Sequence, residues 1–422
     1  MLAQECAYFP TLMPRADQLA FQEWEFGLFL HFGIRTFYED HADWDGQPMP
    51  PEAFNPSELD CKQWVRLAKE AGAKYLVLTA KHHDGFVLWP SRYTDYSVAS
   101  TPWKQGQGDV VREFTDACAA YEMKVGLYYS PFDVDMPKYD DPTQYDDYFI
   151  NQIGELLTNY GEVNIIWLDG AGCVGHQWDW PRIFAAIRRM QPSALVFHIG
   201  DADFRWGGNE GGVGPYPNWN TAEYEGYPAR WLPAECDTLM RKSWFYSSKE
   251  EHTVRGLDEL LGVYYYSVGR GCNLLLNIGP DQRGLLPEKD SQRLLQLGAE
   301  IRRRFSQPRM QLDAFTREGD VWEHVRPGGQ WQNMEHPLLI DHAVLMEDLA
   351  QGETIRRFAI DVVPPFWNAG YVTIYEGRNI GHKAICRFPQ VAFEKIRLRV
   401  LEADGPVRLR AFDLFNTVGE RE

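Results

Sequence analysis

The sequence predicts a parallel α/β domain followed by a smaller all-β domain. Three observations support this prediction: apolar runs that each end in a polar residue, amphipathic helical segments between these runs, and a change of character after about Gln307. Alternation of strand and helix is typical of a parallel sheet. Alternation of apolar and charged residues, seen in the last part of the chain, is typical of half-buried antiparallel strands.

The most informative apolar run covers residues 164–170 and ends in Asp169. Strands buried on both faces of a parallel sheet are continuous apolar runs. Five similar runs also end in polar residues: His31 after residues 26–30, Lys81 to Asp84 after 75–80, Ser130 after 125–129, His198 after 195–197 and Asn277 after 274–276. Catalytic groups of α/β enzymes lie at the carboxyl ends of parallel strands. The pattern therefore predicts an enzyme pocket.

Helical segments lie between the strands. Ser57 is the expected N-cap of the first helix, and Asp109 is expected to open the second. Further helices are predicted over about residues 144–160, 178–190, 254–268 and 287–305. Six strands precede Phe305, and a barrel needs two more within residues 201–255; an open doubly wound sheet is the alternative. No GxGxxG sequence follows a strand, so a dinucleotide site is not supported.

The last part of the chain is predicted to be a small β-sandwich. Residues 396–400 and 407–411 alternate apolar with charged side chains, and turn signals such as Asp404-Gly405-Pro406 separate them. We therefore predict two domains, residues 1–306 and residues 307–422.

Composition limits the classes of partner. The formal net charge of -18 over 422 residues argues against nucleic acid and against an anionic membrane surface. The seven cysteines form no CxxC pair, and no apolar run reaches membrane-spanning length. Because the first residues contain no signal-peptide pattern, we expect a cytoplasmic protein.

Two carboxylates are the candidate catalytic groups. Asp169 follows a buried strand, where an aspartate is costly unless it is used or paired. Glycoside cleavage needs a second acid, and Glu210 is the best candidate because it lies among glycines and aromatic residues. The alternative for Glu210 is an ordinary loop carboxylate.

Histidines and tryptophans are candidate ligand contacts. His82 and His83 are adjacent, so on an extended strand they would point to opposite faces and chelate a metal poorly. We therefore predict no metal site and no cofactor, and expect these imidazoles to bind hydroxyl groups. Trp44, Trp167 and Trp244 are either stacking platforms for a sugar or core residues. No GxSxG nucleophile elbow occurs.

Several of these segments resemble glycoside hydrolase family 29, the retaining α-L-fucosidases. The matching segments are residues 25–33, 78–86 (with Ala-Lys-His-His-Asp-Gly-Phe), 126–131, 167–170 and 268–280. The resemblance implies a (β/α)8-like catalytic domain and a C-terminal β-sandwich. It also implies that Asp169 is the nucleophile. Residues 205–210, Arg-Trp-Gly-Gly-Asn-Glu, resemble the acid/base segment of the subfamily that prefers α-1,3 and α-1,4 linkages, which makes Glu210 the acid/base.

The resemblance further implies which residues bind fucose and what the substrate is. The family's sugar contacts correspond to His31, Trp44, His82, His83, Tyr128, Trp167, Arg205 and Trp244. The family usually has Glu before the tryptophan, whereas this chain has Asp43, whose side chain is shorter by one methylene. The implied partner is a fucosylated oligosaccharide of the Lewis a or Lewis x type. The sequence does not predict the oligomeric state.

Three other functions are consistent with the same residues. One is a fucosidase of broader linkage specificity. Another is an α-L-galactosidase, because L-galactose differs from fucose only by a hydroxyl on C6 and an apolar pocket rejects such an addition weakly. The third is a catalytically silent sugar-binding protein, which the presence of both carboxylates disfavours.

Overall fold

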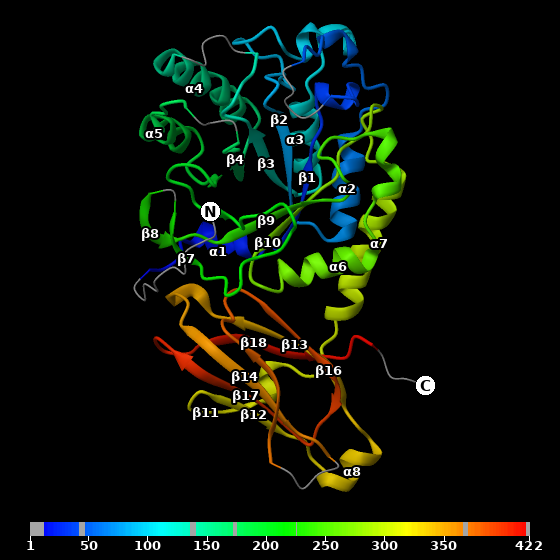
Figure 1. The fold of residues 1–422 in the computed structure, drawn as a ribbon, viewed down its shortest axis with the longest axis vertical. Coiled ribbons are helices and arrows are strands. Elements are labelled where there is room, and N and C mark those ends of the chain that lie inside the picture. The colour runs from blue at the N-terminus through cyan, green and yellow to red at the C-terminus, as the bar shows by residue number, and fades with distance from the viewer. Residues whose placement is uncertain are drawn as a thin grey trace.

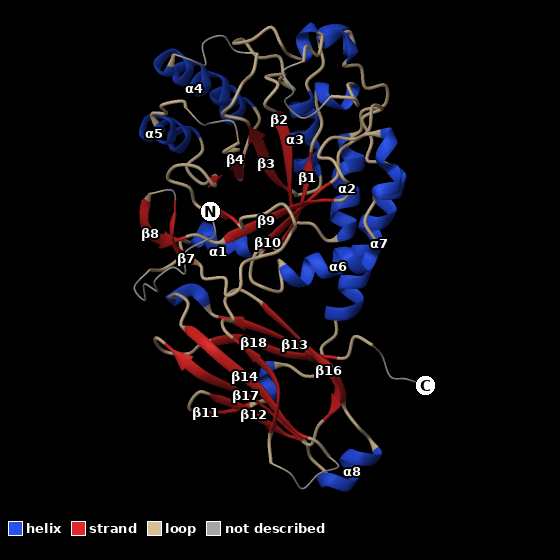
Figure 2. Ribbon diagram, in the orientation of Figure 1, coloured by secondary structure: helices blue, strands red, loops and turns tan. Residues whose placement is uncertain are grey.

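Eight parallel strands form one sheet that curls into a near-barrel in the first part of the chain (Figure 1; Figure 2). The computed structural model describes residues 12–41, 47–135, 141–171, 175–224, 226–365 and 370–418. Around the sheet the order is β5 (Leu195–Phe197), β4 (Ile165–Trp167), β3 (Lys124–Tyr129), β2 (Tyr75–Lys81), β1 (Phe26–Leu30), β10 (Asn273–Asn277), β9 (Ala234–Leu239) and β6 (Arg205–Trp206). The predicted barrel-type fold is confirmed, and the two strands missing from the sequence pattern, β6 and β9, lie within residues 201–255.

Helices cover the outside of this sheet. They are α2 (Cys61–Ala71), α3 (Val110–Ala120), α4 (Pro142–Asn159), α5 (Trp180–Met190), α6 (Leu257–Tyr266) and α7 (Glu288–Phe305). The first helix, α1 (Ala16–Gln22), instead packs Phe21 into the barrel interior at the amino end of β10. Asp109 caps α3 as predicted, but the cap of α2 is Asp60 and not Ser57, because the Asp60 side chain accepts the Gln63 N–H. Between β6 and β9 the described chain forms a hairpin, β7 (Thr221–Tyr224) and β8 (Tyr227–Trp231), where a regular barrel has a helix.

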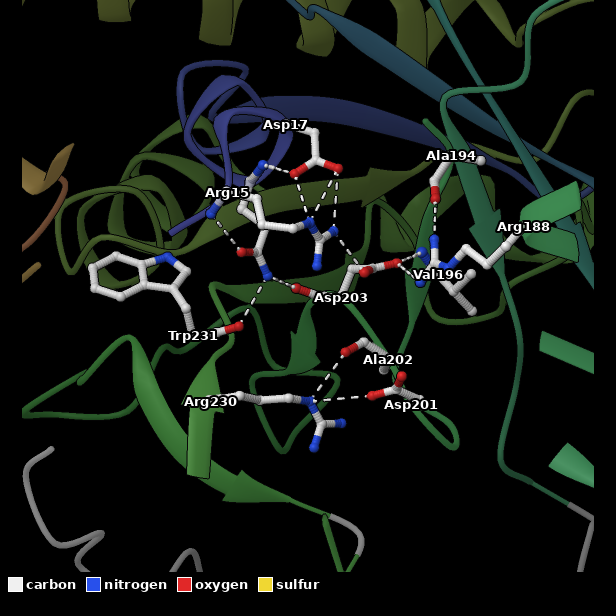
Figure 3. A network of polar contacts seen from close by, with 11 residues as sticks. Arg15, Asp17, Arg188, Ala194, Val196, Asp201, Ala202, Asp203, Arg230 and Trp231 are labelled. Atoms are coloured by element: carbon white, nitrogen blue, oxygen red, sulfur yellow. Dashed lines mark hydrogen bonds and ion pairs between the residues drawn. The ribbon is translucent and has the colours of Figure 1, made fainter. Parts of the chain in front are cut away.

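The barrel closes weakly between β5 and β6. One isolated parallel bridge, Phe197 to Phe204, joins the two sheet ends. Asp203 strengthens this seam (Figure 3): its side chain accepts the Val196 N–H at 2.7 Å and pairs with Arg188 at 2.5 Å and Arg15 at 2.7 Å. The carboxylate therefore joins α5, the N-terminal segment and β5 at the place where few backbone hydrogen bonds connect β5 with β6.

Two antiparallel sheets form the C-terminal part, as predicted. One has the order β11 (Thr316–Glu318), β12 (Val321–Val325), β17 (Lys395–Ala403), β14 (Ile355–Val363), β15 (Val372–Gly377); the other is β16 (Ala384–Ala392), β13 (Leu339–Glu347), β18 (Leu409–Phe415). Alternate side chains of both sheets, among them Phe358, Ile360, Leu345 and Phe412, form a separate apolar core. A short helix, α8 (Gly329–Glu335), lies between β12 and β13.

The two parts pack against each other through buried polar contacts. Tyr265 on α6 lies 2.9 Å from His342 on β13, and Glu25 pairs with His382 and with Lys383. Burial alone would raise the pKa of Glu25, but attraction to Lys383 and the hydrogen bond with His382 lower it to about 2. None of the described helices is both long and apolar enough to cross a bilayer.

Candidate active site

A cavity of about 390 Å³ lies at the carboxyl ends of the barrel strands. Its size is within the roughly 300–1,000 Å³ typical of small-molecule pockets. Predicted residues that line it are His31, His82, His83, Tyr128, Trp167, Asp169, Glu210 and Trp244. The structure thus brings together the side chains that follow β1, β2, β4 and β6, which are far apart in the sequence.

Hydrogen bonds to both carboxylate oxygens hold Asp169 in place. Oδ1 accepts the Ala171 N–H at 2.8 Å, and Oδ2 accepts the Tyr128 hydroxyl at 2.9 Å. Burial favours the neutral acid, but hydrogen bonding and attraction to His83, together with the Ala171 and Tyr128 hydrogen bonds, lower the pKa of Asp169 below the usual value for aspartate. The side chain is 25% exposed, so the ionised carboxylate is oriented and still accessible from the cavity.

His83 lies beside this carboxylate in a fixed orientation. Its Nδ1 is 2.6 Å from Ser130 Oγ, and Ser130 donates its own proton to the Phe132 carbonyl at 2.7 Å. Ser130 must therefore accept from His83, which places a proton on Nδ1. Nε2 then faces Asp169 Oδ2 at 3.5 Å and the Tyr128 hydroxyl at 3.5 Å.

His31 enters the cavity as a neutral imidazole. Asn277 donates its amide N–H to the Trp244 carbonyl at 2.7 Å, so its Oδ1 accepts from His31 Nδ1 at 2.7 Å. Burial lowers the pKa of His31 to about 3. Nε2 is therefore an acceptor at neutral pH, which suits a sugar hydroxyl.

His82 lies next to both of the other histidines. Its ring centroid is 4.3 Å from that of His83 and 5.6 Å from that of His31. Burial, with repulsion from the neighbouring cationic side chains, lowers the pKa of His82 well below its ordinary value. Among the described residues, no group hydrogen-bonds to its buried Nδ1.

The expectation that His82 and His83 point to opposite faces is wrong. β2 ends at Lys81, and the two histidines lie in the turn that follows, where the strand alternation no longer applies. Both rings consequently line one cavity. Even so, the described residues contain no group of three or more His, Cys, Asp or Glu side chains arranged to hold a metal ion.

Aromatic rings form the floor of the cavity. Trp167 stacks on Phe197 with ring centroids 4.0 Å apart and on Tyr128 at 5.3 Å. Its indole N–H donates to Glu235 at 2.9 Å, and Tyr75 donates to the same carboxyl at 2.6 Å. Burial raises the pKa of Glu235 to about 8 despite these two hydrogen bonds. Because its N–H is already used, Trp167 offers a ligand an apolar ring.

The cavity contains residues that the sequence did not identify as site residues. Phe29, Phe197, Trp206 and Asp237 also line it, together with His198, which the sequence already placed at the end of a buried strand. Trp206 donates its indole N–H to Asp237 at 2.7 Å. Burial, with repulsion from Glu210 and Asp169, raises the pKa of Asp237 to about 7. His198 has a left-handed backbone, φ 69°, which is uncommon outside glycine and often marks functional sites.

Glu210 differs from Asp169 in being exposed on a loop. The Asn209 side chain shapes the turn beside it, since Oδ1 accepts the Gly211 N–H at 3.0 Å and Nδ2 donates to the Val213 carbonyl at 2.8 Å. An exposed carboxyl on such a turn is accessible to solvent and to a leaving group.

Two predicted contacts are not placed at the cavity. In the two-residue strand β6, Trp206 faces the cavity, so the neighbouring Arg205 faces away. The Arg205 guanidinium instead donates to Asn218 Oδ1 at 2.6 Å and to the Trp219 carbonyl at 2.9 Å. Its contact with a sugar stays a prediction without geometric support. Trp44 and Asp43 lie outside the described residues.

A larger cavity of about 620 Å³ lies between α6 and the C-terminal sheets. Its lining includes Tyr266, Arg270 and Lys383, and neither Asp169 nor Glu210. The smaller cavity is therefore the candidate active site, because it combines strand-end carboxylates with histidines whose pKa values are perturbed.

Known proteins resemble this chain over most of its length. The family model for alpha-L-fucosidase matches residues 4–303. A relative from Oryza sativa subsp. japonica is 35% identical over 447 residues, covering 96% of this chain and 85% of its own. Alpha-L-fucosidase 1 of Arabidopsis thaliana is 39% identical over 304 residues, which cover 68% of this chain and 59% of that protein.

A crystal structure of a glycoside hydrolase 29 family member from an unknown rumen bacterium superposes with a TM-score of 0.87. It is 32% identical in sequence, and the match covers 99% of this chain and 79% of the other. The chain therefore belongs to glycoside hydrolase family 29 and is an alpha-L-fucosidase.

Proposed function

We propose that this fucosidase releases terminal α-1,3- and α-1,4-linked fucose from branched glycans by double displacement. Asp169 is the nucleophile and Glu210 the general acid/base. One observation carries the proposal: a half-buried, doubly hydrogen-bonded carboxylate and an exposed carboxyl line the same cavity. A nucleophile must stay ionised and oriented, whereas an acid/base must exchange its proton with a leaving group and with water.

The two steps follow from these roles. In the first, an Asp169 oxygen attacks the anomeric carbon, the bond from that carbon to the glycosidic oxygen breaks, and Glu210 gives its proton to the departing oxygen. In the second, Glu210 takes a proton from water, the water oxygen attacks the same carbon, and the bond to Asp169 breaks. Two inversions give net retention, which requires carboxyl groups roughly 5–5.5 Å apart.

The remaining lining suits fucose. The 6-deoxy sugar has an apolar methyl group, for which Trp167, Phe197 and Phe29 provide an aromatic surface. Its three free hydroxyls are hydrogen-bond donors, and His31 Nε2 offers one of them an acceptor. The half-buried Trp244 ring, 4.9 Å from His31, is the proposed platform at the side of the sugar.

The catalytic pair is tested by two substitutions with different expected signatures. Asp169→Ala should lower kcat by several orders of magnitude, and azide should restore turnover by giving the inverted β-fucosyl azide. Glu210→Ala should lose far more activity on oligosaccharides than on an activated aryl fucoside, because a good leaving group needs little protonation. An Asp169→Ala enzyme with more than a tenth of wild-type activity, or equal losses for Glu210→Ala on both substrates, would contradict the assignment.

The linkage preference is tested separately. In Lewis-type glycans, fucose and galactose are attached to neighbouring carbons of one N-acetylglucosamine. A contact to the galactose arm would supply binding energy remote from the scissile bond. Residues 206–219 are the proposed place for this contact, since Val213 and Tyr216 on this stretch are exposed. We expect higher kcat/KM for Lewis a and Lewis x trisaccharides than for α-1,2-linked 2'-fucosyllactose. Values within threefold of each other would argue for the broader-specificity alternative.

A further inference from the structure

The segment that carries Glu210 is rich in glycine and exposed at its tip. Residues 207–217, here termed the Glu210 loop, contain five glycines: Gly207, Gly208, Gly211, Gly212 and Gly214. Glycine loses the most backbone freedom when it is ordered, so such a loop adopts one shape only if other groups fix it. Asn209 shapes the turn itself, but it lies within the loop and does not attach the loop to the barrel.

Besides the isolated bridge between Gly211 and Thr238 of β9, Arg270 attaches the loop to the barrel. This arginine lies in the turn between α6 and β10, and its guanidinium donates to the Gly214 carbonyl at 2.9 Å. The Gly214 N–H in turn donates to the carbonyl of Tyr266 at 2.7 Å. Both backbone polar groups of Gly214 are thus bonded to one short stretch of the barrel.

The same guanidinium lies between two tyrosine rings. Its central carbon is 4.5 Å from the ring centroid of Tyr266 on α6 and 5.3 Å from that of Tyr216 in the Glu210 loop. Arginine suits this arrangement because its planar cation stacks on aromatic faces while its N–H groups donate in the plane. Arg270 therefore fixes the loop at two positions, by a hydrogen bond and by stacking.

The C-terminal sheets hold the far end of the loop. The Arg378 N–H donates to the Tyr216 hydroxyl at 3.0 Å, and Asn379 donates to the Asn218 carbonyl at 2.9 Å. Asn218 donates to the Arg270 carbonyl at 3.0 Å, which connects the two sets of contacts. The part of the chain after the barrel thus contacts the loop that bears the acid, although it contributes no residue to the lining of the candidate active site.

We propose that Arg270 is a positioning residue for the acid/base: by fixing Gly214 and Tyr216 it holds Glu210 where its proton reaches the glycosidic oxygen. This inference rests on the proposed role of Glu210. Arg270 does not line the catalytic cavity, so its loss should leave fucose binding and nucleophilic attack intact. Only the step that needs a correctly placed proton should slow.

The test compares variants on two fucosides, one with an unactivated sugar leaving group and one with an activated aryl leaving group. For Arg270→Ala we expect kcat on the oligosaccharide to fall roughly 10- to 100-fold, the range that misplacement of a catalytic group produces. On the aryl fucoside it should fall less than about threefold, with KM little changed on both substrates. Arg270→Lys keeps one donor for Gly214 but not the planar stacking, so it should recover part of the loss.

Gly214→Ala tests the same anchor without removing a charge. A Cβ at this position would lie 2.7 Å from Cys272 Sγ and 3.1 Å from the Tyr266 carbonyl oxygen, so the loop must move away from the barrel. The Gly214→Ala variant should therefore show the same dependence on the leaving group as Arg270→Ala. Gly262→Ala on α6 is the matched control, because its Cβ would meet nothing within 4 Å.

A second control separates positioning from general stability. Arg303 also joins the barrel to the C-terminal sheets, donating to the Thr417 carbonyl at 2.9 Å, but it does not touch the Glu210 loop. Arg303→Ala should lower thermal stability without changing the ratio of activities on the two fucosides. If Arg270→Ala and Gly214→Ala lose activity equally on both substrates, the positioning role is wrong. If Glu210→Ala itself shows no leaving-group dependence, the proposed function fails instead.

Discussion

His31 shows how one amide fixes what an imidazole offers to a ligand. Because the Asn277 N–H is used by the Trp244 carbonyl, its oxygen must accept from His31 Nδ1, and Nε2 is left as an acceptor. The low pKa of His31, about 3, keeps the imidazole neutral at neutral pH. The sugar hydroxyl that meets His31 must therefore be a donor.

Asn277→Ala should weaken sugar binding more than it slows chemistry. Without the amide, the imidazole is free to carry its proton on Nε2 and to rotate, so the hydroxyl loses a fixed acceptor. The cost of an imperfectly paired buried group is about 1–2 kcal/mol, or roughly tenfold in the inhibition constant of fucose. Asn273→Ala, at the other end of the same strand, is the control, since Asn273 donates to the Phe21 carbonyl. Unchanged fucose inhibition in Asn277→Ala would refute the role of this amide.

The site residues that sequence reasoning missed lack a local signal. Asp169 ends a visible apolar run, but Asp237 lies inside β9, Ala-Glu-Cys-Asp-Thr-Leu, where two acids break the apolar pattern. Barrel interiors accept acids only when partners from other strands satisfy them, as Tyr75 and Trp167 do for Glu235. Such partners are distant in sequence, so pattern alone does not predict β9 or its role in the pocket.

At the scale of elements, the barrel depends on polar side chains where few backbone hydrogen bonds join its strands. β5 has three residues and β6 has two, and neither is long enough to give a periodic sequence pattern. Six strands with continuous apolar runs, β5 among them, were located from sequence, whereas β6 was not. The two sheet ends are held by contacts such as the one Asp203 makes with the Val196 N–H. The domain boundary after residue 306 stays a prediction.

Asp203→Ala should destabilise the protein by roughly 3 kcal/mol, because a buried N–H and two arginines lose their partner at once. Asp203 is only 3% exposed, so water does not replace it. Differential scanning calorimetry should show a fall of several degrees in the unfolding midpoint. Asp201→Ala is the matched control: this carboxylate is 66% exposed and 3.8 Å from Arg230, so its loss should change the midpoint little. Equal effects of the two substitutions would contradict a special role for Asp203.

At the scale of the whole molecule, buried acids make stability depend on pH. Burial raises the pKa of Glu235 to about 8 and the pKa values of Asp237 and Asp84 to about 7. In the unfolded chain these acids release their protons near pH 4. Between that pH and the raised pKa, the folded state therefore binds more protons than the unfolded state. These acids make their full contribution to the free energy of unfolding below the pKa values they have in the unfolded chain. This contribution is lost as the pH rises through their pKa values in the folded state.

We therefore expect the thermal unfolding midpoint to decrease as the pH is raised from 6.5 to 8.5. Buried histidines with lowered pKa values, such as His31, act in the opposite sense, but their contribution is already complete above about pH 6.5. Each acid contributes at most about 1.4 kcal/mol per pH unit. Thermal melts across this range measure the slope. Glu235→Gln, which cannot ionise, should make it shallower; a midpoint that is constant or rises with pH would disprove the linkage.

The weak seam between β5 and β6 also determines which strand edges a partly opened barrel would expose. A sheet that does not fully close has two edge strands, and unpaired edges are templates for pairing with other chains. Here both edges are very short, and the ion pairs of Asp203 with Arg15 and Arg188 place charged side chains beside them (Figure 3). Charged groups at a short edge disfavour the approach of another strand. The carboxylate that holds the barrel closed thus also keeps two charged side chains beside the edges that a partly opened barrel would expose.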